Sequence, residues 1–435
     1  MTDLNCYITT FNCGRALVDV DYFAANLFNG LQTNLPPDLV VLSLQEIAPI
    51  GYSFLGGSLL TPYLTRFTRA VNLAAALRTD DFEYKSVAVG TLGMTAIMVF
   101  ATADVAQRIR WVETAGVGVG LLEMGNKAAI AVRLGLGLGS ELEENDEVAM
   151  TFVAAHLAPF EGNWERRNLD WKSVCEGLVF ESSRDRRRLE DGESEAEPLL
   201  SSREGNTSGD SRSLFEAVSH VFVAGDLNYR AADIAPQPED HRNWPQPAES
   251  ASDSHHYSHL LKQDQLNREI KIKKTLHNLA EPPIDFPPTY KYSKAAQAEA
   301  ALRRTTTPVK DEGHTWLWAK HRVPSWCDRV LYLAAAPPTV HSYTALPVQP
   351  TSDHRPVSLA FSIPLKPLDL SSADVKAPFP VRKDWKEARA TARNYELIVG
   401  LAAYLSLTWE GEALLAGTIV GILGGYLALR AMIGT

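Results

Sequence analysis

The chain contains little cysteine: four residues among 435, with no Cys-x-x-Cys pair and no ligand-like cluster. This scarcity argues against a disulfide framework and a structural zinc site, and it suits a reducing compartment. The first residues (MTDLNCYITTFNCG) also lack a basic segment followed by an apolar run, so we expect no cleaved secretory signal.

Positive charge is also scarce, since 42 Lys and Arg face 52 Asp and Glu and the formal net charge is −10. A broad basic surface is typical of nucleic-acid-binding proteins, so the sequence predicts no nucleic-acid partner. A polyanionic ligand must therefore bind in a local pocket. The hydrophobic content of 45% is ordinary for a globular chain and permits a sizeable core.

Short apolar segments rich in Val, Ile, Thr and aromatic residues predict buried strands. These strands are expected at Asn5–Asn12, Leu39–Glu46, Thr95–Ala101, Ala128–Leu134, Val148–His156, His220–Asp226, Arg329–Ala334 and Val357–Ile363. Helices are expected at Asp21–Asn34 and Tyr63–Leu77. This pattern favours an α/β (α+β) sandwich of two stacked sheets with helices outside. Residues 181–213 and 231–256, which are charged or rich in proline, are expected to be mobile surface insertions.

The composition changes after residue 363. Residues 364–394 contain four prolines and a basic cluster, and we interpret them as a linker. Residues 395–435 are predicted to be a C-terminal membrane anchor. Within them, Ala413–Leu429 carries no charge over seventeen residues, about 25 Å of helix at ~1.5 Å per residue. The basic cluster upstream predicts a catalytic domain on the cytosolic side.

Two other structures for the tail remain open. An apolar helix could pack on the domain instead of entering a membrane, or two short helices could form a hairpin around Glu410–Glu412. Gly417, Gly421 and Gly425 stand four residues apart and give a close-packing helix face that soluble helices seldom offer. This spacing favours the membrane anchor.

Polar side chains recur at the ends of the predicted strands, where they converge at one edge of a sheet. Asn12 ends the first strand and Glu46 the second. A hard divalent cation takes oxygen ligands, and Mg²⁺ commonly takes one or two protein carboxylates while keeping several waters. Glu46 is therefore the favoured Mg²⁺ ligand, and a polar strand exit at Gln45–Glu46 is the alternative.

The segment VAGDLNYR, residues 223–230, gives the strongest indication of chemistry. Asp226 and Asn228 are two residues apart, so in an extended conformation they point to the same side. A carboxylate that orients or deprotonates water, beside an amide that donates to a phosphate oxygen, is what phosphoryl transfer to water requires. A structural turn also accounts for Asp226 and Asn228, but less readily for the Tyr–Arg pair that follows.

Three further groups lie at strand ends. Asn126–Lys127 precede a predicted strand, and His156 ends another. Asp328 opens a strand, and Asp353–His354 precede the last one. A histidine with a buried Asp partner has a fixed tautomer and a stabilised charged form. Each group taken alone fits a structural role equally well, but their recurrence favours a common site.

Eight motifs, in order, resemble those of the inositol polyphosphate 5-phosphatases: FNCG, LQE, GNKAAIAVR, HL…ERRN, GDLNYR, PPTYKY, PSWCDRVLY and SDHRPV. The match spans roughly residues 3–363, and GDLNYR together with WCDR is the most specific part. The resemblance implies the endonuclease/exonuclease/phosphatase superfamily and its DNase-I-like four-layer sandwich of two mainly antiparallel sheets. A catalytic domain over residues 1–363 with an apolar helical tail resembles the small tail-anchored 5-phosphatases of the endoplasmic reticulum.

The resemblance also implies a role for each matching residue. The metal site is formed by Glu46, Asn12 and Asp353. The residues around the scissile phosphate are Asp226 (which positions the attacking water), Asn228, His354, Asp328 (which orients His354) and His156. The substrate-binding residues are Asn126, Lys127, Tyr290, Lys291 and Arg329, and of these Tyr290 and Lys291 approach the 4-phosphate.

The expected function is Mg²⁺-dependent removal of the 5-phosphate from phosphatidylinositol 4,5-bisphosphate, by a monomer at the endoplasmic reticulum membrane. No Cys-x5-Arg loop is present, so the cysteine-phosphatase mechanism lacks its residues. Two alternatives remain: a nuclease or sphingomyelinase on the same scaffold, and a catalytically inactive lipid-binding scaffold.

Overall fold

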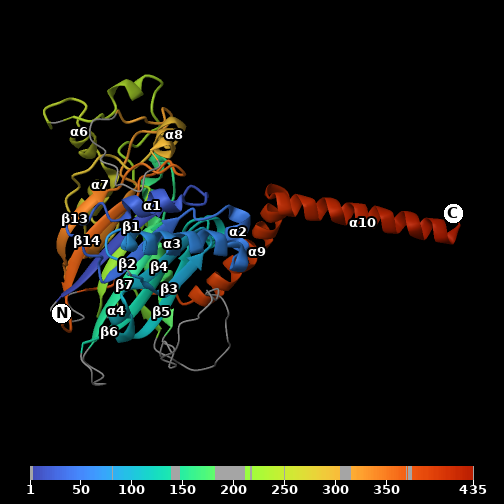
Figure 1. Ribbon diagram of the computed structural model, residues 1–435, viewed down its shortest axis with the longest axis horizontal. Helices are drawn as coiled ribbons and strands as arrows, with labels where there is room; N and C mark the ends of the chain where they lie inside the picture. The colour runs from blue at the N-terminus through green and yellow to red at the C-terminus, as the bar shows by residue number, and fades with distance from the viewer. Residues whose placement is uncertain are drawn as a thin grey trace.

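The computed structural model describes residues 3–80, 82–138, 147–181, 211–215, 218–248, 250–303, 315–368, 370 and 375–434. Two six-stranded sheets pack face to face, and helices lie on their outer sides (Figure 1). Apolar side chains from both inner faces form the central cluster, in which the Phe222 and Phe361 rings lie 4.5 Å apart. Helices cover the outer faces as well, so central strands such as Leu39–Gln45 and Thr95–Ala101 are buried on both sides and nearly continuously apolar.

The first sheet has the strand order β13-β14-β1-β2-β4-β3. Its strands are β1 (Asp3–Asn12), β2 (Leu39–Gln45), β3 (Lys85–Leu92), β4 (Thr95–Ala101), β13 (Thr339–Ala345) and β14 (Val357–Pro364). Strands β1 and β2 pair in parallel and the other neighbours are antiparallel. The parallel pair brings the ends of β1 and β2 to the same sheet edge.

The second sheet has the order β11-β12-β10-β7-β6-β5. Its strands are β5 (Ile109–Gly118), β6 (Ala128–Gly137), β7 (Glu147–His156), β10 (His220–Asp226), β11 (Leu279–Ala280) and β12 (Asp328–Leu333). Strands β7 and β10 form its parallel pair. The predicted mainly antiparallel sandwich is therefore confirmed. A two-stranded sheet of β8 (Val179–Glu181) and β9 (Ser211–Ser213) packs against the second sheet, where the Arg133 guanidinium of β6 lies 3.8 Å from the Phe180 ring centre.

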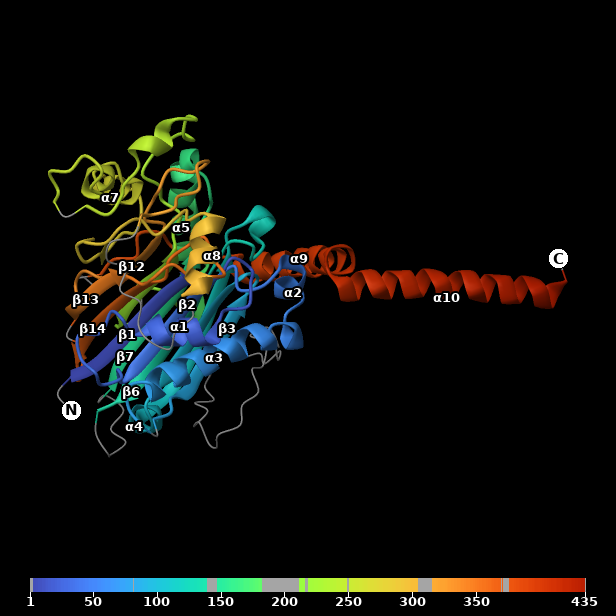
Figure 2. The same cartoon turned by 45° about the horizontal axis from the view of Figure 1, so that its top comes forward.

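The main outer helices are α1 (Val20–Leu27) and α3 (Thr61–Ala76) on the first sheet and α5 (Trp164–Gly177) on the second. The shorter helices are α2 (Ile50–Leu55), α4 (Ala103–Arg108), α6 (Ser258–Leu261), α7 (Gln265–Lys271) and α8 (Lys294–Leu302). Single 3₁₀ turns are η1 (Gly57–Leu59), η2 (Leu121–Glu123), η3 (Glu161–Asn163) and η4 (Asp240–Asn243). Helices α6 and α7 lie at the end of the molecule opposite α4 (Figures 1 and 2).

Two sequence expectations differ from the structure in detail. Helix α1 ends at Leu27, well before Asn34, because Gly30 is pressed against strand β14, where a Cβ atom would lie 2.6 Å from Ser358 Oγ. The insertion expected at 231–256 is described except for residue 249, and its regular structure is the single turn η4. Most of the insertion expected at 181–213 lies outside the described residues.

The tail forms two helices, α9 (Trp385–Leu407) and α10 (Trp409–Ile433). The expected division at residues 394 and 395 therefore falls inside α9, which packs against α2. Gly51 and Gly400 allow this contact, because a Cβ on Gly400 would lie 2.7 Å from Phe54 Cβ. Helix α10 extends away from the body (Figures 1 and 2). Among the described helices it alone has the length and apolar composition to cross a membrane, and its apolar window is unburied.

Candidate active site

A cavity of about 510 Å³ opens where the ends of the two parallel strand pairs meet. Strands β1, β2, β7 and β10 place polar residues at this edge because their carboxyl ends point the same way. The sequence-predicted residues that line it are Asn12, Glu46, Lys127, His156, Asp226, Asn228, Tyr290, Lys291, Asp353 and His354. The predicted convergence is thus observed, and the individual roles of these residues remain predictions.

Asp226 is the buried centre of this group. Its Oδ2 accepts a hydrogen bond from Asn12 Nδ2 at 2.9 Å and lies 3.3 Å from His156 Nε2 and 3.9 Å from His354 Nε2. Burial alone raises the pKa of Asp226, but His354, His156 and Lys127 outweigh it and hold the pKa below its ordinary value. A permanently ionised carboxylate suits the orientation of water better than the uptake of a proton.

Asn228 reaches the cavity in a way the sequence does not predict. Strand β10 ends at Asp226, and Asn228 has a φ of 58°, so the extended geometry expected for this pair is wrong. The turn is held by Leu227 N and Asn228 N, which donate to Cys327 O at 2.8 and 3.3 Å. One amide proton of Asn228 is donated to Leu157 O at 3.1 Å. Its second amide proton remains for a ligand.

His354 is held by a carboxylate behind it. Its Nδ1 lies 2.9 Å from Asp328 Oδ2, which also accepts a hydrogen bond from Thr289 Oγ1 at 2.7 Å. Burial disfavours the imidazolium, but Asp328 and Asp226 outweigh it and raise the pKa of His354 to about 9. The imidazolium Nε2–H faces Asp226 and the cavity. Asp328 is wholly buried outside the cavity lining, so among the cavity residues it meets a ligand only through His354, and its predicted orienting role remains a prediction.

Glu46 sits on a strained backbone at the exit of β2. Its φ is 47°, and its carbonyl accepts a hydrogen bond from Arg15 N at 2.7 Å. A non-glycine residue in this region costs on the order of 1–3 kcal/mol and is common at functional sites. Its carboxylate attracts positive charge, since Arg15 Nε lies 3.1 Å from Oε2 and Lys127 Nζ lies 3.8 Å from Oε1.

Lys127 and His156 form a second polar pair. Lys127 Nζ lies 2.7 Å from His156 Nε2. Burial and the Lys127 charge lower the pKa of His156. Burial also lowers the pKa of Lys127, while Glu46 and Asp226 oppose the change. This pair offers a cation to an anionic ligand.

Tyr290 and Lys291 also line the cavity. Lys291 Nζ is paired with Asp353 Oδ2 at 2.7 Å. Burial alone raises the pKa of Asp353, but the charges of His354 and Lys291 outweigh it and lower the pKa. The Tyr290 ring packs on His354 at 4.5 Å, and the Arg230 guanidinium lies 4.4 Å from the Tyr290 ring centre. The expected contact of Lys291 with a 4-phosphate remains a prediction.

Three predicted site residues do not line the cavity: Asp328, as described above, Arg329 and Asn126. Arg329 is fully buried and pairs with Asp264 at 3.0 Å and Glu281 at 2.6 Å, so its expected substrate contact is not formed. The reason is strand alternation: in β12 the side chain that follows Asp328 points to the other face. Asn126 borders the site without lining the cavity, and its buried Oδ1 has no hydrogen-bond partner among the described residues.

Among the lining residues that were not predicted, four have basic side chains: Arg15, Arg230, Lys294 and His321. The sequence does give an indication for Arg230, because a structural turn does not readily account for the Tyr–Arg pair that follows Asn228. Its guanidinium donates to Asn228 Oδ1 and, at 3.0 Å, to Asn228 O, so it supports that turn. The other three lie in segments without a distinctive pattern.

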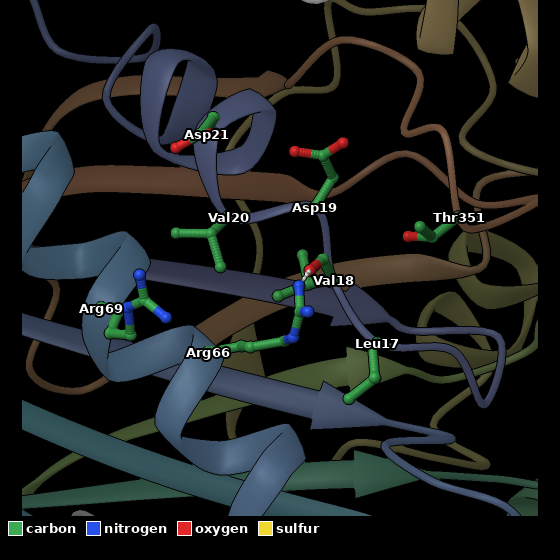
Figure 3. A pocket seen from close by; sticks show the side chains of 8 residues that line it. All are labelled: Leu17, Val18, Asp19, Val20, Asp21, Arg66, Arg69 and Thr351. Carbon is green, nitrogen blue, oxygen red and sulfur yellow. Dashed lines mark hydrogen bonds between the residues drawn. The ribbon is translucent and has the colours of Figure 1, made fainter.

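The cavity is basic within an acidic chain. Five Lys or Arg residues line it against three acidic residues, whereas the whole chain carries a net charge of −10. A neighbouring cavity of about 470 Å³ shares Thr351 with it (Figure 3). There two Asp and two Arg residues balance each other. Polyanion binding is therefore favoured at the first cavity and not at the second.

The donor set of the first cavity fits a hard divalent cation. Glu46, Asn12 and Asp353 place oxygen atoms along its wall, as Mg²⁺ prefers. Asp226, Asp328 and His354 also lie within 4.8 Å of one another through their ligand atoms. Within this trio Asp328 and His354 are hydrogen-bonded at 2.9 Å, whereas His354 Nε2 lies 3.9 Å from Asp226 Oδ2.

Residues 9–360 match the profile of the endonuclease/exonuclease/phosphatase family 2. The chain belongs to this family.

Among the curated relatives is the polyphosphatidylinositol phosphatase INP53 of Saccharomyces cerevisiae, which is 27% identical over 83% of this chain and 26% of its own length. The phosphatidylinositol 3,4,5-trisphosphate 5-phosphatase 2B of Danio rerio is 30% identical over 68% of this chain and 20% of its own length. The chain spans about a quarter or less of these relatives. Their names confirm the resemblance to the 5-phosphatase group.

The family fold is confirmed by a solved structure. The inositol polyphosphate 5-phosphatase domain of SPsynaptojanin, in complex with inositol (1,4)-bisphosphate and calcium ion, matches with a TM-score of 0.57. It is 23% identical, and the match covers 90% of each chain. The four-layer, DNase-I-like sandwich predicted from the motifs is therefore present.

Proposed function

We propose that this family member is a Mg²⁺-dependent phosphatase that removes the 5-phosphate from phosphatidylinositol 4,5-bisphosphate and leaves the 4-phosphate lipid. The observation that carries the proposal is the basic cavity that Asp226, Asn228, His354 and Glu46 line together. The named relatives act on phosphoinositides or inositol phosphates, which supports the substrate class.

Each cavity residue has a different role in the proposed hydrolysis. Asp226 orients a water for attack on phosphorus, while the charged His354 and the free amide proton of Asn228 contact the phosphate oxygens. The water oxygen bonds to phosphorus as the bond between phosphorus and the inositol oxygen breaks. The attacking water loses one proton to solvent and the leaving inositol oxygen takes one up from solvent, so the products are inorganic phosphate and the free hydroxyl. Mg²⁺ held by Glu46, with Asn12 and Asp353 nearby, would neutralise developing negative charge. Lys291 and Tyr290 would recognise the 4-phosphate.

Exposed apolar groups near the cavity support action at a lipid surface. Leu121 and Leu122 are 72% and 57% exposed and precede Asn126 by a few residues. Phe160, next to the cavity residue Pro159, is 52% exposed. Large exposed apolar side chains grouped at a site are typical of membrane or partner contacts. We propose a monomer on the cytosolic face of the endoplasmic reticulum membrane, anchored by its tail.

A substrate panel tests the proposed function. The full chain in detergent is expected to release phosphate from water-soluble dioctanoyl phosphatidylinositol 4,5-bisphosphate with Mg²⁺, to form the 4-phosphate lipid, and to stop after chelation. The same panel includes the 3,4,5-trisphosphate lipid, inositol 1,4,5-trisphosphate, abasic DNA and sphingomyelin. Glu46→Gln should lower turnover about 10²-fold, while the exposed Glu239→Gln should not. Cleavage of abasic DNA or sphingomyelin in place of the 5-phosphate would refute the proposal.

The tail can be tested by truncation. A chain ending at Thr408 is expected to move from the membrane pellet to the supernatant after alkaline extraction, because it lacks the one described helix suited to spanning. Its turnover of dioctanoyl substrate should equal that of the full chain, because α10 contacts no cavity residue. A truncated chain that stays in the pellet would show that α10 is not the anchor.

A further inference from the structure

Helix α9, which leads to the apolar helix α10, is hydrogen-bonded to the active-site wall. Glu396 lies on its inner side with only 3% of its side chain exposed. Its Oε1 accepts a hydrogen bond from Gly125 N at 2.7 Å, and Arg393 Nη1 lies 3.2 Å from its Oε2. Gly125 directly precedes Asn126 and Lys127. The tail helix therefore contacts the segment that presents the Lys127 cation.

The contact continues toward Glu46 through the backbone. Gly125 O accepts a hydrogen bond from Met94 N at 2.9 Å, and Met94 O accepts one from Ile47 N at 3.2 Å. Ile47 directly follows Glu46. Three hydrogen bonds thus connect Glu396 to two segments that line the cavity. One segment carries Lys127 and the other carries Glu46.

The backbone segments joined by these three hydrogen bonds are closely packed. A Cβ atom on Gly93 would lie 2.2 Å from Gly125 O, and one on Gly125 would lie 3.0 Å from Glu396 Oε1. The backbones therefore touch, and closely packed contacts transmit small displacements. Helix α9 is itself fixed, since Arg393 donates to the carbonyl oxygens of Phe54 and Leu55.

We propose that Glu396 is a positioning residue of the active site. From the tail helix it holds Gly125, and through Gly125 it sets the place of Lys127 and of the strand exit that bears Glu46. Helix α9 is then part of the catalytic body, and α10 is the membrane segment. As far as turnover is concerned, this inference rests on the proposed phosphatase function.

Three full-length variants in detergent test the role. Glu396→Ala removes the acceptor for Gly125 N, and kcat/KM for dioctanoyl phosphatidylinositol 4,5-bisphosphate should fall about 10- to 100-fold. Glu396→Gln keeps an oxygen acceptor and should recover most of that loss. Glu410→Ala is the matched control: it removes the 2.9 Å hydrogen bond from Tyr52 to Glu410 in the same tail contact, away from Gly125, and should leave kcat/KM unchanged.

Hydrogen exchange gives a readout that does not need turnover. Peptides covering residues 119–127 should exchange faster in Glu396→Ala than in the wild type and remain protected in Glu410→Ala. Equal losses of kcat/KM in the Ala variants at 396 and 410 would overturn the positioning role, as would unchanged exchange in Glu396→Ala. Faster exchange in Glu396→Ala alongside an inactive wild type would uphold the structural link and refute the proposed function instead.

Discussion

Asp226→Asn is expected to lower kcat for phosphate release by about 10³-fold. Asn preserves the size of the side chain and can still accept the 3.1 Å hydrogen bond from Asn228 N. The variant lacks the negative charge that orients the attacking water in the proposed mechanism. The same charge balances the positive charges of His354 and Lys127. The measurement is kcat and KM on dioctanoyl phosphatidylinositol 4,5-bisphosphate at saturating Mg²⁺.

The control for this variant is Asp233→Asn, in the segment that follows the same strand. Asp233 is 46% exposed and pairs with Arg268 on the surface, so its loss should leave kcat within about twofold, as surface pairs contribute little. Both variants should show native circular dichroism. Asp226→Asn with more than a tenth of wild-type kcat would remove Asp226 from the proposed mechanism.

Eight strands and their polar ends could be predicted from sequence because the local pattern determines them, whereas the edge strands β3, β5, β11 and β13 were not predicted. Strand β2 (LVVLSLQ) is buried at every position, and the apolar run in the sequence shows this directly. The convergence of Asn12, Glu46, His156 and Asp226 follows from the parallel pairs of β1 with β2 and of β7 with β10. Parallel neighbours end at one edge, so their terminal side chains must meet there.

The parts that could not be predicted depend on contacts distant in sequence. Arg329 adjoins Asp328 in the same motif, yet strand alternation and the carboxylates of Asp264 and Glu281 place it in the core. The motif identifies Arg329 but does not predict which face of the sheet its side chain occupies. Glu396 is 271 residues from Gly125, and no local pattern links a helix residue in the tail to a glycine turn.

Asp328→Asn tests whether the buried carboxylate acts through His354. Asp328 Oδ2 lies 2.9 Å from His354 Nδ1 and helps to raise the pKa of His354 to about 9. Loss of the carboxylate lowers the pKa of His354, so a smaller fraction carries the charge that faces the phosphate. We expect kcat to fall about 10²- to 10³-fold near neutral pH, with the alkaline limb of the kcat profile displaced toward lower pH.

The direction in which the alkaline limb of the kcat profile moves distinguishes a role through His354 from a purely structural role of Asp328. A raised pKa keeps His354 charged at higher pH, so the wild type should keep its activity further into the alkaline range than Asp328→Asn. A variant that only loosened the fold would lose kcat equally at every pH and would lower the thermal midpoint. Because both residues form one unit, Asp328→Asn combined with His354→Ala should be no slower than His354→Ala alone. Multiplicative losses in the double variant would show that Asp328 acts independently of His354.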